Sequence, residues 1–350
     1  MQLNQAQQEA VDYVNGPCLV LAGAGSGKTR VITTKIVSLI NKHFIAPQQI
    51  CAVTFTNKAA AEMRDRVKQE LGSERSSLIT ISTFHSLGLN ILKEESVALG
   101  LGRNFTLFDQ YDSFKLIKDI VREKFPQILV DNSEKTVVEE IATDISTWKT
   151  SLLRPEDIAV RTIRVQVYEA YQAYLSACNA ADFEDLIFKT TLLLRDNQAV
   201  RDKWSSYYKY ILVDEYQDTN ETQYQLLKYL TSKNKRFTVV GDDDQSIYAW
   251  RGARPENIKV LSNDFPDLKV IKLEQNYRST QHILNCANKL ISNNEHIFNK
   301  TLYTKSNVGK KVQIMELRTQ NDEADRVVQL ILAHQFRTHS QWKEYAVLYR

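Results

Sequence analysis

The residues from Leu19 to Thr29, LVLAGAGSGKT, have the types and the spacing that bind a phosphate group. Their glycines lack Cβ atoms, so a tight loop can turn successive backbone N–H groups toward one anion. The Lys28 ammonium can reach the outer phosphates, and the Thr29 hydroxyl can ligate the magnesium ion that accompanies them. The strict pattern opens on glycine, where this chain has Ala22. We predict a phosphate-binding loop, against the alternative of a glycine-rich turn that binds nothing.

Two carboxylates follow a later apolar run, Tyr210–Val213. In an open parallel sheet, ligands bind beyond the carboxyl ends of the strands, where the phosphate loop also lies. Asp214 can hold Mg²⁺, usually through its water shell, and Glu215 can orient and deprotonate an attacking water. Taken alone, the pair fits a solvated strand end better than a catalytic site. Together with the upstream phosphate loop, it predicts a site for phosphoryl chemistry.

The next strand is followed by residues 241–252, GDDDQSIYAWRG. The Gln245 amide, placed at a strand end near a γ-phosphate, can hydrogen-bond both the phosphate and the attacking water. Tyr248 and Trp250 offer two flat aromatic faces beside the planar cation of Arg251, the composition of a platform on which unpaired bases stack. The alternative is that the two aromatic residues belong to the core.

Residues 54–58 and 83–86 follow strand ends on the same side of the predicted sheet. Each segment combines hydroxyl and aromatic groups with an amide, cation or imidazole, which suits phosphate hydrogen bonds and base stacking. The alternative is that they are helix N-caps and core aromatics. His85 has no nucleophile or metal partner beside it, so we expect no catalytic role for it. The predicted single-strand contacts are Phe55, Thr56, Asn57, Lys58, Thr83, His85, Tyr248, Trp250 and Arg251.

Two more residues have side chains that suit nucleotide binding. The Gln7 amide has a donor and an acceptor that could pair with the edge of adenine, although an exposed helical glutamine is the simpler alternative. Arg278 could reach across a cleft to the γ-phosphate as an arginine finger. Because the segment around Arg278 begins a second sheet, we expect its position to be weakly supported.

The elements that must position these residues alternate between strand and helix. Buried-type strands are predicted at 18–22, 50–55, 79–83, 210–213 and 237–240, and helices at 3–14, 29–42 and from residue 57. This alternation predicts an α/β fold with a doubly wound parallel sheet. Residues 86–181 have helical spacing and predict a mostly helical insertion. The stretch from 312–314 to 346–349 has the β-α-β pattern of a second sheet.

Length and composition restrict the class of protein. At 350 residues, two or three domains are expected. The net charge of +3 is too small to identify a nucleic-acid binder by itself. The four scattered cysteines lack metal-ligand spacing and fit reduced thiols, and the polar N-terminus has no signal-peptide pattern. No stretch is apolar enough for a membrane span. We predict a soluble, cytoplasmic protein without a membrane partner.

Over essentially all 350 residues the chain resembles the superfamily 1A DNA helicases, the UvrD/Rep/PcrA family, and within it most closely the Rep type. The resemblance rests on LNQAQQEAV, AGAGSGKTR, AVTFTNKAAAEM, ISTFH, DFEDL, LVDEYQDTN, VVGDDDQSIYAWRGA and LEQNYRS. It implies a RecA-like parallel-sheet P-loop NTPase domain with a helical insertion, followed by the start of a second RecA-like domain. ATP and Mg²⁺ are the implied cofactors.

The resemblance also implies a role for each matching residue. Catalytic roles fall on Glu215 as base, Gln245 as γ-phosphate sensor and Arg278 as γ-phosphate contact. Thr29 and Asp214 would be the magnesium ligands. Gln7 would contact adenine, and Arg30 and Tyr277 would flank the base. The implied nucleotide-binding set is Gln7, Ala22, Gly23, Ala24, Gly25, Ser26, Gly27, Lys28, Thr29, Arg30, Tyr277 and Arg278.

Members of this family consist of four subdomains. The resemblance places subdomain 1A at residues 1–85 and 181–275, 1B at 86–180, and the start of a truncated 2A at 276–350. Subdomain 2B and the later motifs, which supply a second arginine finger, are not among these residues. We therefore expect low activity and no unwinding from these 350 residues alone.

By resemblance, the function is that of an ATP-dependent 3′-to-5′ helicase or translocase on single-stranded DNA, acting in replication through fork progression or restart. The implied partners are single-stranded DNA, 3′-tailed duplex DNA and replication-fork proteins, bound as a monomer or a DNA-induced dimer. Two alternatives stay open. One is a UvrD/PcrA-type repair helicase, and the other is a nucleotide-gated DNA-binding scaffold that does not unwind.

Overall fold

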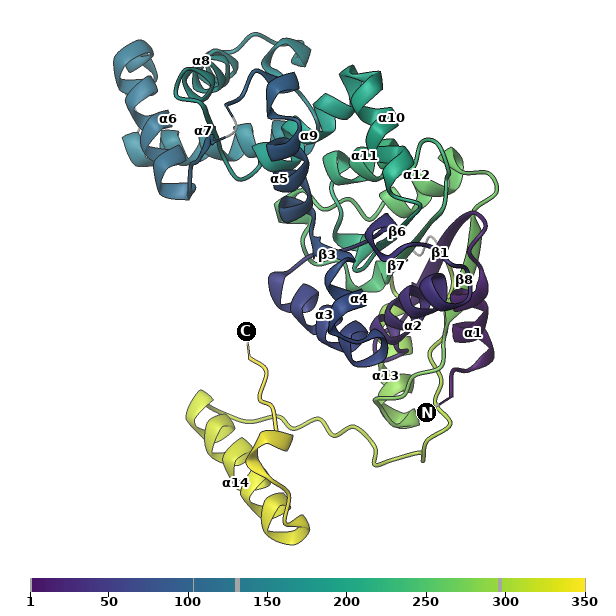
Figure 1. Cartoon of the computed structure of the whole chain (residues 1–350). Helices are drawn as coiled ribbons and strands as arrows, with labels where there is room; N and C mark the ends of the chain where they lie inside the picture. The colour runs from purple at the N-terminus through teal and green to yellow at the C-terminus, as the bar shows by residue number, and fades with distance from the viewer. Residues whose placement is uncertain (1, 103, 130–132, 295–297, 350) are drawn as a thin grey trace.

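A parallel sheet forms the centre of the computed structural model, which describes residues 2–102, 104–129, 133–294 and 298–349 (Figure 1). Within these residues the sheet has six strands in the order β3-β2-β6-β7-β1-β8, and all neighbours are parallel. The strands are β1 (Pro17–Ala22), β2 (Ile50–Thr54), β3 (Thr80–Thr83), β6 (Tyr210–Val213), β7 (Phe237–Gly241) and β8 (Lys269–Leu273). The predicted α/β class is confirmed.

Helices cover both faces of this sheet, which explains the continuous apolar runs. Every residue of β1, β2, β6 and β7 is buried. Alternate residues enter different clusters: Leu19 and Leu21 pack on one face, whereas Cys18 and Val20 pack on the other. β8 is not predicted from the sequence, because it is an edge strand whose two lysines are exposed.

One face carries α1 (Gln5–Asp12), α2 (Lys28–Asn41) and α3 (Asn57–Leu71). The other face carries α5 (Phe84–Glu94), α9 (Asp185–Asp196), α10 (Gln198–Tyr207), α11 (Glu221–Leu230) and α12 (Asn257–Asp264). The remaining helix outside the insertion and the C-terminal part is α4 (Ser73–Ser77). Short 3₁₀ turns lie at Pro47–Gln49, Ser96–Leu99, Pro126–Leu129, Pro155–Asp157, Tyr216–Asp218, Asp243–Gln245, Ala249–Arg251 and Trp342–Glu344.

The strand order brings three functional segments together. β7 lies between β6 and β1, with Val213 beside Val239 and Leu21 beside Gly241. Because the strands are parallel, the segments after β1, β6 and β7 leave the sheet at the same edge. The phosphate loop, the acidic pair and the aspartate-rich turn are therefore neighbours.

A helical insertion lies between α5 and α9, and it begins later than the predicted residue 86 because α5 packs on the sheet. It contains α6 (Gln110–Lys124), α7 (Glu134–Thr150) and α8 (Ile163–Ala177), which pack around an apolar cluster of their own. Figure 1 shows this unit beside the main sheet. Two short strands, β4 (Thr106–Leu107) and β5 (Ala180–Ala181), pair in parallel and join the start of the insertion to its end. Two-residue strands are too short to leave an alternating sequence pattern.

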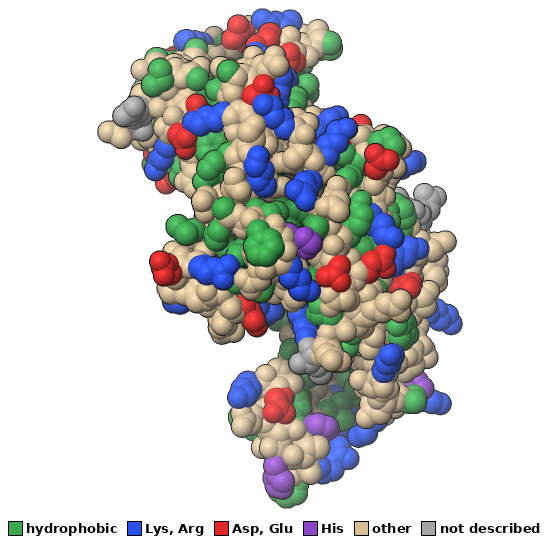
Figure 2. Space-filling view, turned by 45° about the vertical axis from the view of Figure 1, so that its right-hand side comes forward, with side chains coloured by type: hydrophobic (Ala, Val, Ile, Leu, Met, Phe, Trp, Pro, Cys, Tyr) green, Lys and Arg blue, Asp and Glu red, His purple; other side chains and the backbone are tan. Residues whose placement is uncertain are grey.

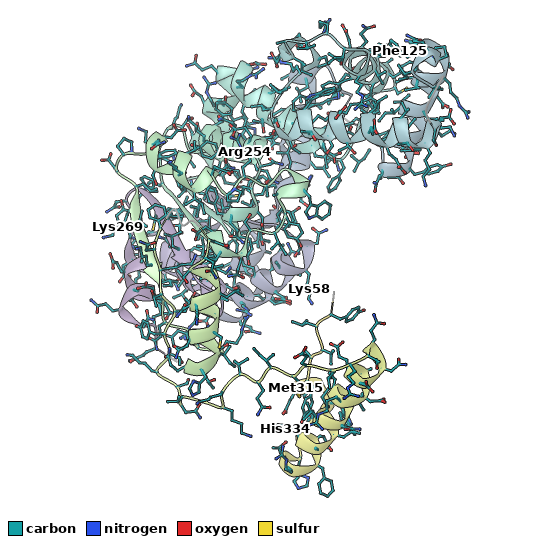
Figure 3. All side chains as sticks on the ribbon, turned by 180° about the vertical axis from the view of Figure 1, so that it is seen from behind. Lys58, Phe125, Arg254, Lys269, Met315 and His334 are labelled. Atoms are coloured by element: carbon teal, nitrogen blue, oxygen red, sulfur yellow. The ribbon has the colours of Figure 1, made fainter. Side chains whose placement is uncertain are left out.

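The C-terminal part contains α13 (Gln281–Ile291) and α14 (Gln320–Thr338). Figures 1 and 3 show α14, which contains His334 and has Met315 near it, set apart from the sheet. The strands expected at 312–314 and 346–349 are not formed, and Ile314 is 96% exposed. A strand needs a neighbour for its backbone groups, and neither stretch pairs with another strand in the described residues.

No helix in the described parts of the chain combines the length and the apolar character needed to cross a membrane.

A buried ion-pair cluster joins the insertion to the sheet unit. The Lys149 ammonium, at the end of α7, lies 2.5 Å from Asp182 Oδ2 and 2.9 Å from Asp185 Oδ1. The Thr222 hydroxyl donates to the Lys149 carbonyl at 2.6 Å. Burial alone would lower the pKa of Lys149, but the charges of the two aspartates outweigh it and raise the pKa. All three charged side chains are buried, so the cluster is sensitive to losing one member.

Replacing Lys149 by methionine removes the cation of buried Asp182 and leaves buried Asp185 with Lys189, 3.2 Å away, as its remaining cation. We expect Lys149→Met to lower the free energy of unfolding by about 3–5 kcal/mol. Lys135→Met, on the same helix, is the matched control, because Lys135 is exposed and 3.8 Å from Glu139. Its effect should stay below about 1 kcal/mol. Urea denaturation measures both, and equal losses would contradict the importance of the buried cluster.

Candidate functional site

The phosphate loop has a backbone that only glycine adopts easily at two positions. Gly25 has φ +67° and Gly27 has φ +90°, both in the left-handed region. A Cβ on Gly27 would lie 2.8 Å from Gln7 Nε2, and one on Gly25 would lie 2.8 Å from the Arg278 Cβ. The loop is therefore closely packed by distant segments. Of the other predicted loop residues, Ala22 ends β1, Ser26 is buried, and Thr29 and Arg30 lie in the first turn of α2.

Gln7 is buried against this loop, so it is not an ordinary exposed glutamine. Its Nε2 donates to the Ser26 carbonyl at 2.8 Å, and its Oε1 accepts from the Asn4 backbone N–H at 3.0 Å. The Asn4 side chain in turn accepts from the Gln7 N–H, which completes a capping box at the start of α1. One amide hydrogen and one lone pair of Gln7 are left for an adenine edge.

An ion pair connects the phosphate loop to the acidic strand end. Lys28 Nζ lies 2.9 Å from Glu215 Oε2. Glu215 has φ 51° and ψ 46°, a left-handed conformation that is strained for a residue with a side chain. A phosphate in the loop would compete with Glu215 for the same ammonium. Both residues are predicted from the sequence, and the fold brings them into direct contact.

Asp214 is the buried member of the acidic pair and fits a magnesium ligand. Its Oδ1 accepts from the Glu215 backbone N–H at 3.0 Å. Burial first, and then the charge of Glu215, raise the pKa of Asp214 to about 6. A divalent cation would offset this cost of ionisation, and carboxylate and hydroxyl oxygens are the ligands that Mg²⁺ prefers. Thr29 is the hydroxyl that the sequence pairs with Asp214 for this role.

Gln217 is a site residue that sequence reasoning missed. Its Nε2 donates to Glu215 Oε2 at 2.9 Å, and its Oε1 accepts from the Asp242 backbone N–H at 2.9 Å. Gln217 is buried, and its two hydrogen bonds connect the end of β6 to the end of β7. The only sequence signal for it is its position two residues after Glu215.

The turn after β7 is held by ionic contacts. Gln245 Nε2 donates to Asp242 Oδ2, and Gln245 itself is exposed at the edge of the sheet. The Lys300 ammonium contacts Asp242 and Asp243 and lies 2.9 Å from Asp244 Oδ2. Sequence reasoning missed Lys300, because it lies far along the chain from the turn.

The segment that carries Arg278 is firmly attached to the phosphate loop, contrary to our expectation. Asn276 Nδ2 donates to the Ala24 carbonyl at 2.6 Å, and the Tyr277 N–H donates to the Gly25 carbonyl at 2.9 Å. Asn276 Oδ1 accepts from the Arg278 backbone N–H at 2.8 Å. These bonds fix the Arg278 backbone without a second sheet. The Arg278 side chain is exposed.

Aromatic side chains line up near the same edge of the sheet. Phe55 and Tyr248 stack with ring centroids 5.3 Å apart, and Tyr248 lies 6.3 Å from Trp250. Trp250 is 75% exposed, so the alternative that it belongs to the core is wrong. His85 stacks at 4.0 Å on Phe183, a half-exposed residue of the DFEDL motif that was not among the predicted single-strand contacts.

The His85 imidazole is expected to be neutral at pH 7. Burial lowers the pKa of His85 to about 4, so protonation would occur only in acid. A neutral ring can stack without the repulsion or attraction of a charge. On the face shown in Figure 2, hydrophobic and histidine side chains lie close to lysine and arginine side chains. Single-stranded nucleic acid binds to surfaces of this composition.

Two predicted contacts have hydroxyls that are used as helix caps. Thr56 Oγ1 accepts from the Ala59 N–H at 3.1 Å, and Thr83 Oγ1 accepts from the Ser86 N–H at 3.2 Å. These bonds agree with the N-cap alternative. Asn57 and Lys58 are exposed in the first turn of α3, and Figure 3 shows Lys58 at the outer surface. The Arg251 side chain lies outside the described part of the chain.

Comparison with known proteins matches the chain to two family models. The model described as "UvrD/REP helicase N-terminal domain" matches residues 3–266. The model described as "UvrD-like helicase C-terminal domain" matches residues 271–350. Between them they include the phosphate loop, both acidic segments and Arg278.

Individual relatives agree with this match. "ATP-dependent DNA helicase Rep" of Escherichia coli is 50% identical over 100% of this chain and 52% of its own length. The Rep protein of Salmonella typhimurium is 49% identical over the same shares. "ATP-dependent DNA helicase PcrA" of Staphylococcus epidermidis is 43% identical over 99% of this chain and 48% of its own length. The chain thus spans about half the length of the curated relatives it matches. With three quarters of its residues inside the first model, the chain belongs to the UvrD/REP helicase family.

Proposed function

We propose that this chain provides the ATP-binding and single-strand-binding part of an ATP-dependent DNA helicase of Rep type. The observation that carries this proposal is the 2.9 Å contact between Lys28 and Glu215, which joins a phosphate-binding lysine to a candidate base. This contact supports hydrolysis over a scaffold that only binds nucleotide. The higher identity to relatives named Rep than to those named PcrA supports the Rep type.

In this proposal the phosphate loop binds ATP, and Lys28 leaves Glu215 to contact the outer phosphates. Thr29 and Asp214 would hold Mg²⁺, which neutralises phosphate charge when bound. Glu215, released from Lys28 and still held by Gln217, can then accept a proton from the attacking water.

Five other side chains complete the proposed nucleotide site. Gln245 is the γ-phosphate sensor, and Arg278 contacts the same phosphate from the 276–278 segment. Arg30 and Tyr277 flank the base, and Gln7 pairs with its edge. Support comes from proximity, since Tyr277 donates its backbone N–H to the loop and its hydroxyl accepts from Asn4 Nδ2 at 2.9 Å.

The proposed DNA path runs over the aromatic side chains at the sheet edge. Stacked Phe55 and Tyr248, exposed Trp250 and the His85–Phe183 pair offer flat surfaces for successive bases. We assign 3′-to-5′ movement on single strands and 3′-tailed duplexes, with a role at replication forks, by similarity to the Rep relatives. A repair role of UvrD/PcrA type is the second candidate, supported by the 43% identity to PcrA.

The subdomain division at residues 85, 180 and 275 is part of this proposal.

The Lys28 and Glu215 roles predict different losses. Lys28→Ala should weaken ATP binding about 10- to 100-fold, because charge-assisted contacts to phosphate are lost. Glu215→Gln should keep the affinity within about threefold but lower turnover by about 10²- to 10⁴-fold, since an amide cannot accept the proton. Equilibrium binding of ATP to the chain measures the affinity. DNA-stimulated hydrolysis by a polypeptide of the relatives' full length measures the turnover. Equal losses of binding and turnover in Glu215→Gln would contradict its role as base.

The raised pKa of Asp214 predicts a pH-dependent gain of stability on its replacement. In the unfolded chain this carboxyl ionises near its ordinary value, whereas in the fold the pKa is about 6. Ionised Asp214 therefore destabilises the fold progressively as pH rises through this window. At pH 7.5, the free energy of unfolding of Asp214→Asn should exceed that of the parent by about 2–3 kcal/mol. Below pH 4 the two should have the same free energy of unfolding. Urea denaturation at each pH measures the difference. Asp267→Asn, at an exposed site, is the control and should show no such pH-dependent gain. If the stability difference between Asp214→Asn and the parent does not change with pH, the pKa of Asp214 is not raised in the fold.

The proposed DNA path predicts that Trp250 contributes a base stack. Trp250→Ala should weaken binding of a labelled single-stranded oligonucleotide by about 1–3 kcal/mol in fluorescence anisotropy. Trp342→Ala is the matched control, since Trp342 is also exposed but lies in the C-terminal part beside α14. Unchanged affinity in a folded Trp250→Ala protein would remove this residue from the path.

A further inference from the structure

A single lysine holds three consecutive aspartates at the carboxyl end of β7. Its ammonium contacts Asp242 and Asp243 and lies 2.9 Å from Asp244 Oδ2, and the Lys300 side chain is only 5% exposed. Burial alone would lower the pKa of Lys300, but the charges and hydrogen bonds of the aspartates outweigh it and raise the pKa. One oxygen from each carboxylate lies within 4.8 Å of the others, so their like charges would repel without this cation.

The aspartates that Lys300 holds are connected to two residues of the proposed ATP site. Asp242 Oδ2 accepts from Gln245 Nε2, so the sensor amide is oriented by a carboxylate that Lys300 also contacts. The Asp242 backbone N–H donates to Gln217 Oε1. Gln217 in turn donates to Glu215 Oε2. Lys300 is thus connected to Gln245 through Asp242, and to Glu215 through Asp242 and Gln217.

Lys300 comes from a segment that also contacts the phosphate loop and the 276–278 segment. The Asn276 N–H donates to the Tyr303 carbonyl at 2.7 Å, and the Tyr303 N–H donates to the Glu274 carbonyl at 3.1 Å. Leu302 packs so closely against Gly23 that a Cβ there would collide with it. Lys300 lies in the part matched by the C-terminal family model, whereas the aspartates lie in the part matched by the N-terminal one.

We propose that Lys300 is a positioning residue for ATP hydrolysis, which fixes the Asp242–Asp244 turn so that Gln245 faces the γ-phosphate. This inference rests on the proposed function. The Lys300 ammonium occupies the place between the three carboxylates that a metal ion would take, so the cluster is an internal ion pair. Because the same segment holds Asn276, the position of the turn is tied to that of Arg278.

The test compares the affinity of the chain for a non-hydrolysable ATP analogue with its affinity for ADP, by calorimetry with Mg²⁺. Only the analogue has a γ-phosphate for Gln245 to contact. Lys300→Met should therefore reduce the analogue-to-ADP affinity ratio about tenfold, with the affinity for ADP changed less than about threefold. Lys300→Arg keeps the positive charge and should recover most of the ratio. Lys305→Met, an exposed lysine of the same segment, is the matched control and should bind as the parent does.

Each outcome separates this inference from the proposed function. A folded Lys300→Met protein with the parent's affinity ratio overturns the positioning role. If Lys28→Ala binds both nucleotides like the parent, the proposed nucleotide site itself is wrong. If Lys300→Met lacks a cooperative unfolding transition, Asp243→Asn is measured instead, since it keeps the size of the side chain and removes one partner of Lys300. A lower ratio in that variant supports the inference, and an unchanged ratio overturns it.

Discussion

The ion pair between Lys28 and Glu215 is the interaction on which the candidate site depends. It joins the loop after β1 to the end of β6, two strands that are separated in the sheet by β7. The pair keeps a cation and a base close together with little net charge. In the proposed function, a phosphate that binds Lys28 would displace Glu215, and the displaced carboxylate would then be available to take a proton. Binding of the substrate and release of the base would thereby be linked in one exchange.

Packing from distant parts of the chain holds the loop in place for this exchange. Gln7 donates to the loop from α1, and Asn276 donates to it from the C-terminal part. Gln217 and Lys300 hold the adjacent strand ends in the same way. The phosphate loop is therefore a junction of the N-terminal and C-terminal family matches, and a nucleotide bound there would contact both.

Local patterns predicted the parts of the molecule whose physics is local. β1, β2, β6 and β7 are buried on both faces, so they read as continuous apolar runs, and the phosphate loop needs glycines at fixed positions. Lys300 and Phe183 could not be predicted, because their contacts depend on which segments the fold brings together. The strand predicted at 312–314 was wrong because pairing is also non-local. Its apolar pattern suits a strand, but no neighbouring strand pairs with it in the described residues.

The most direct test of the central claim is a crystal structure of this chain with Mg²⁺ and a non-hydrolysable ATP analogue. We predict that the analogue's phosphates lie in the loop from Gly23 to Gly27, with Lys28 Nζ on the outer phosphates and no longer on Glu215. Asp214 should face the metal ion. An analogue bound elsewhere, with the 2.9 Å contact between Lys28 and Glu215 intact, would contradict the account.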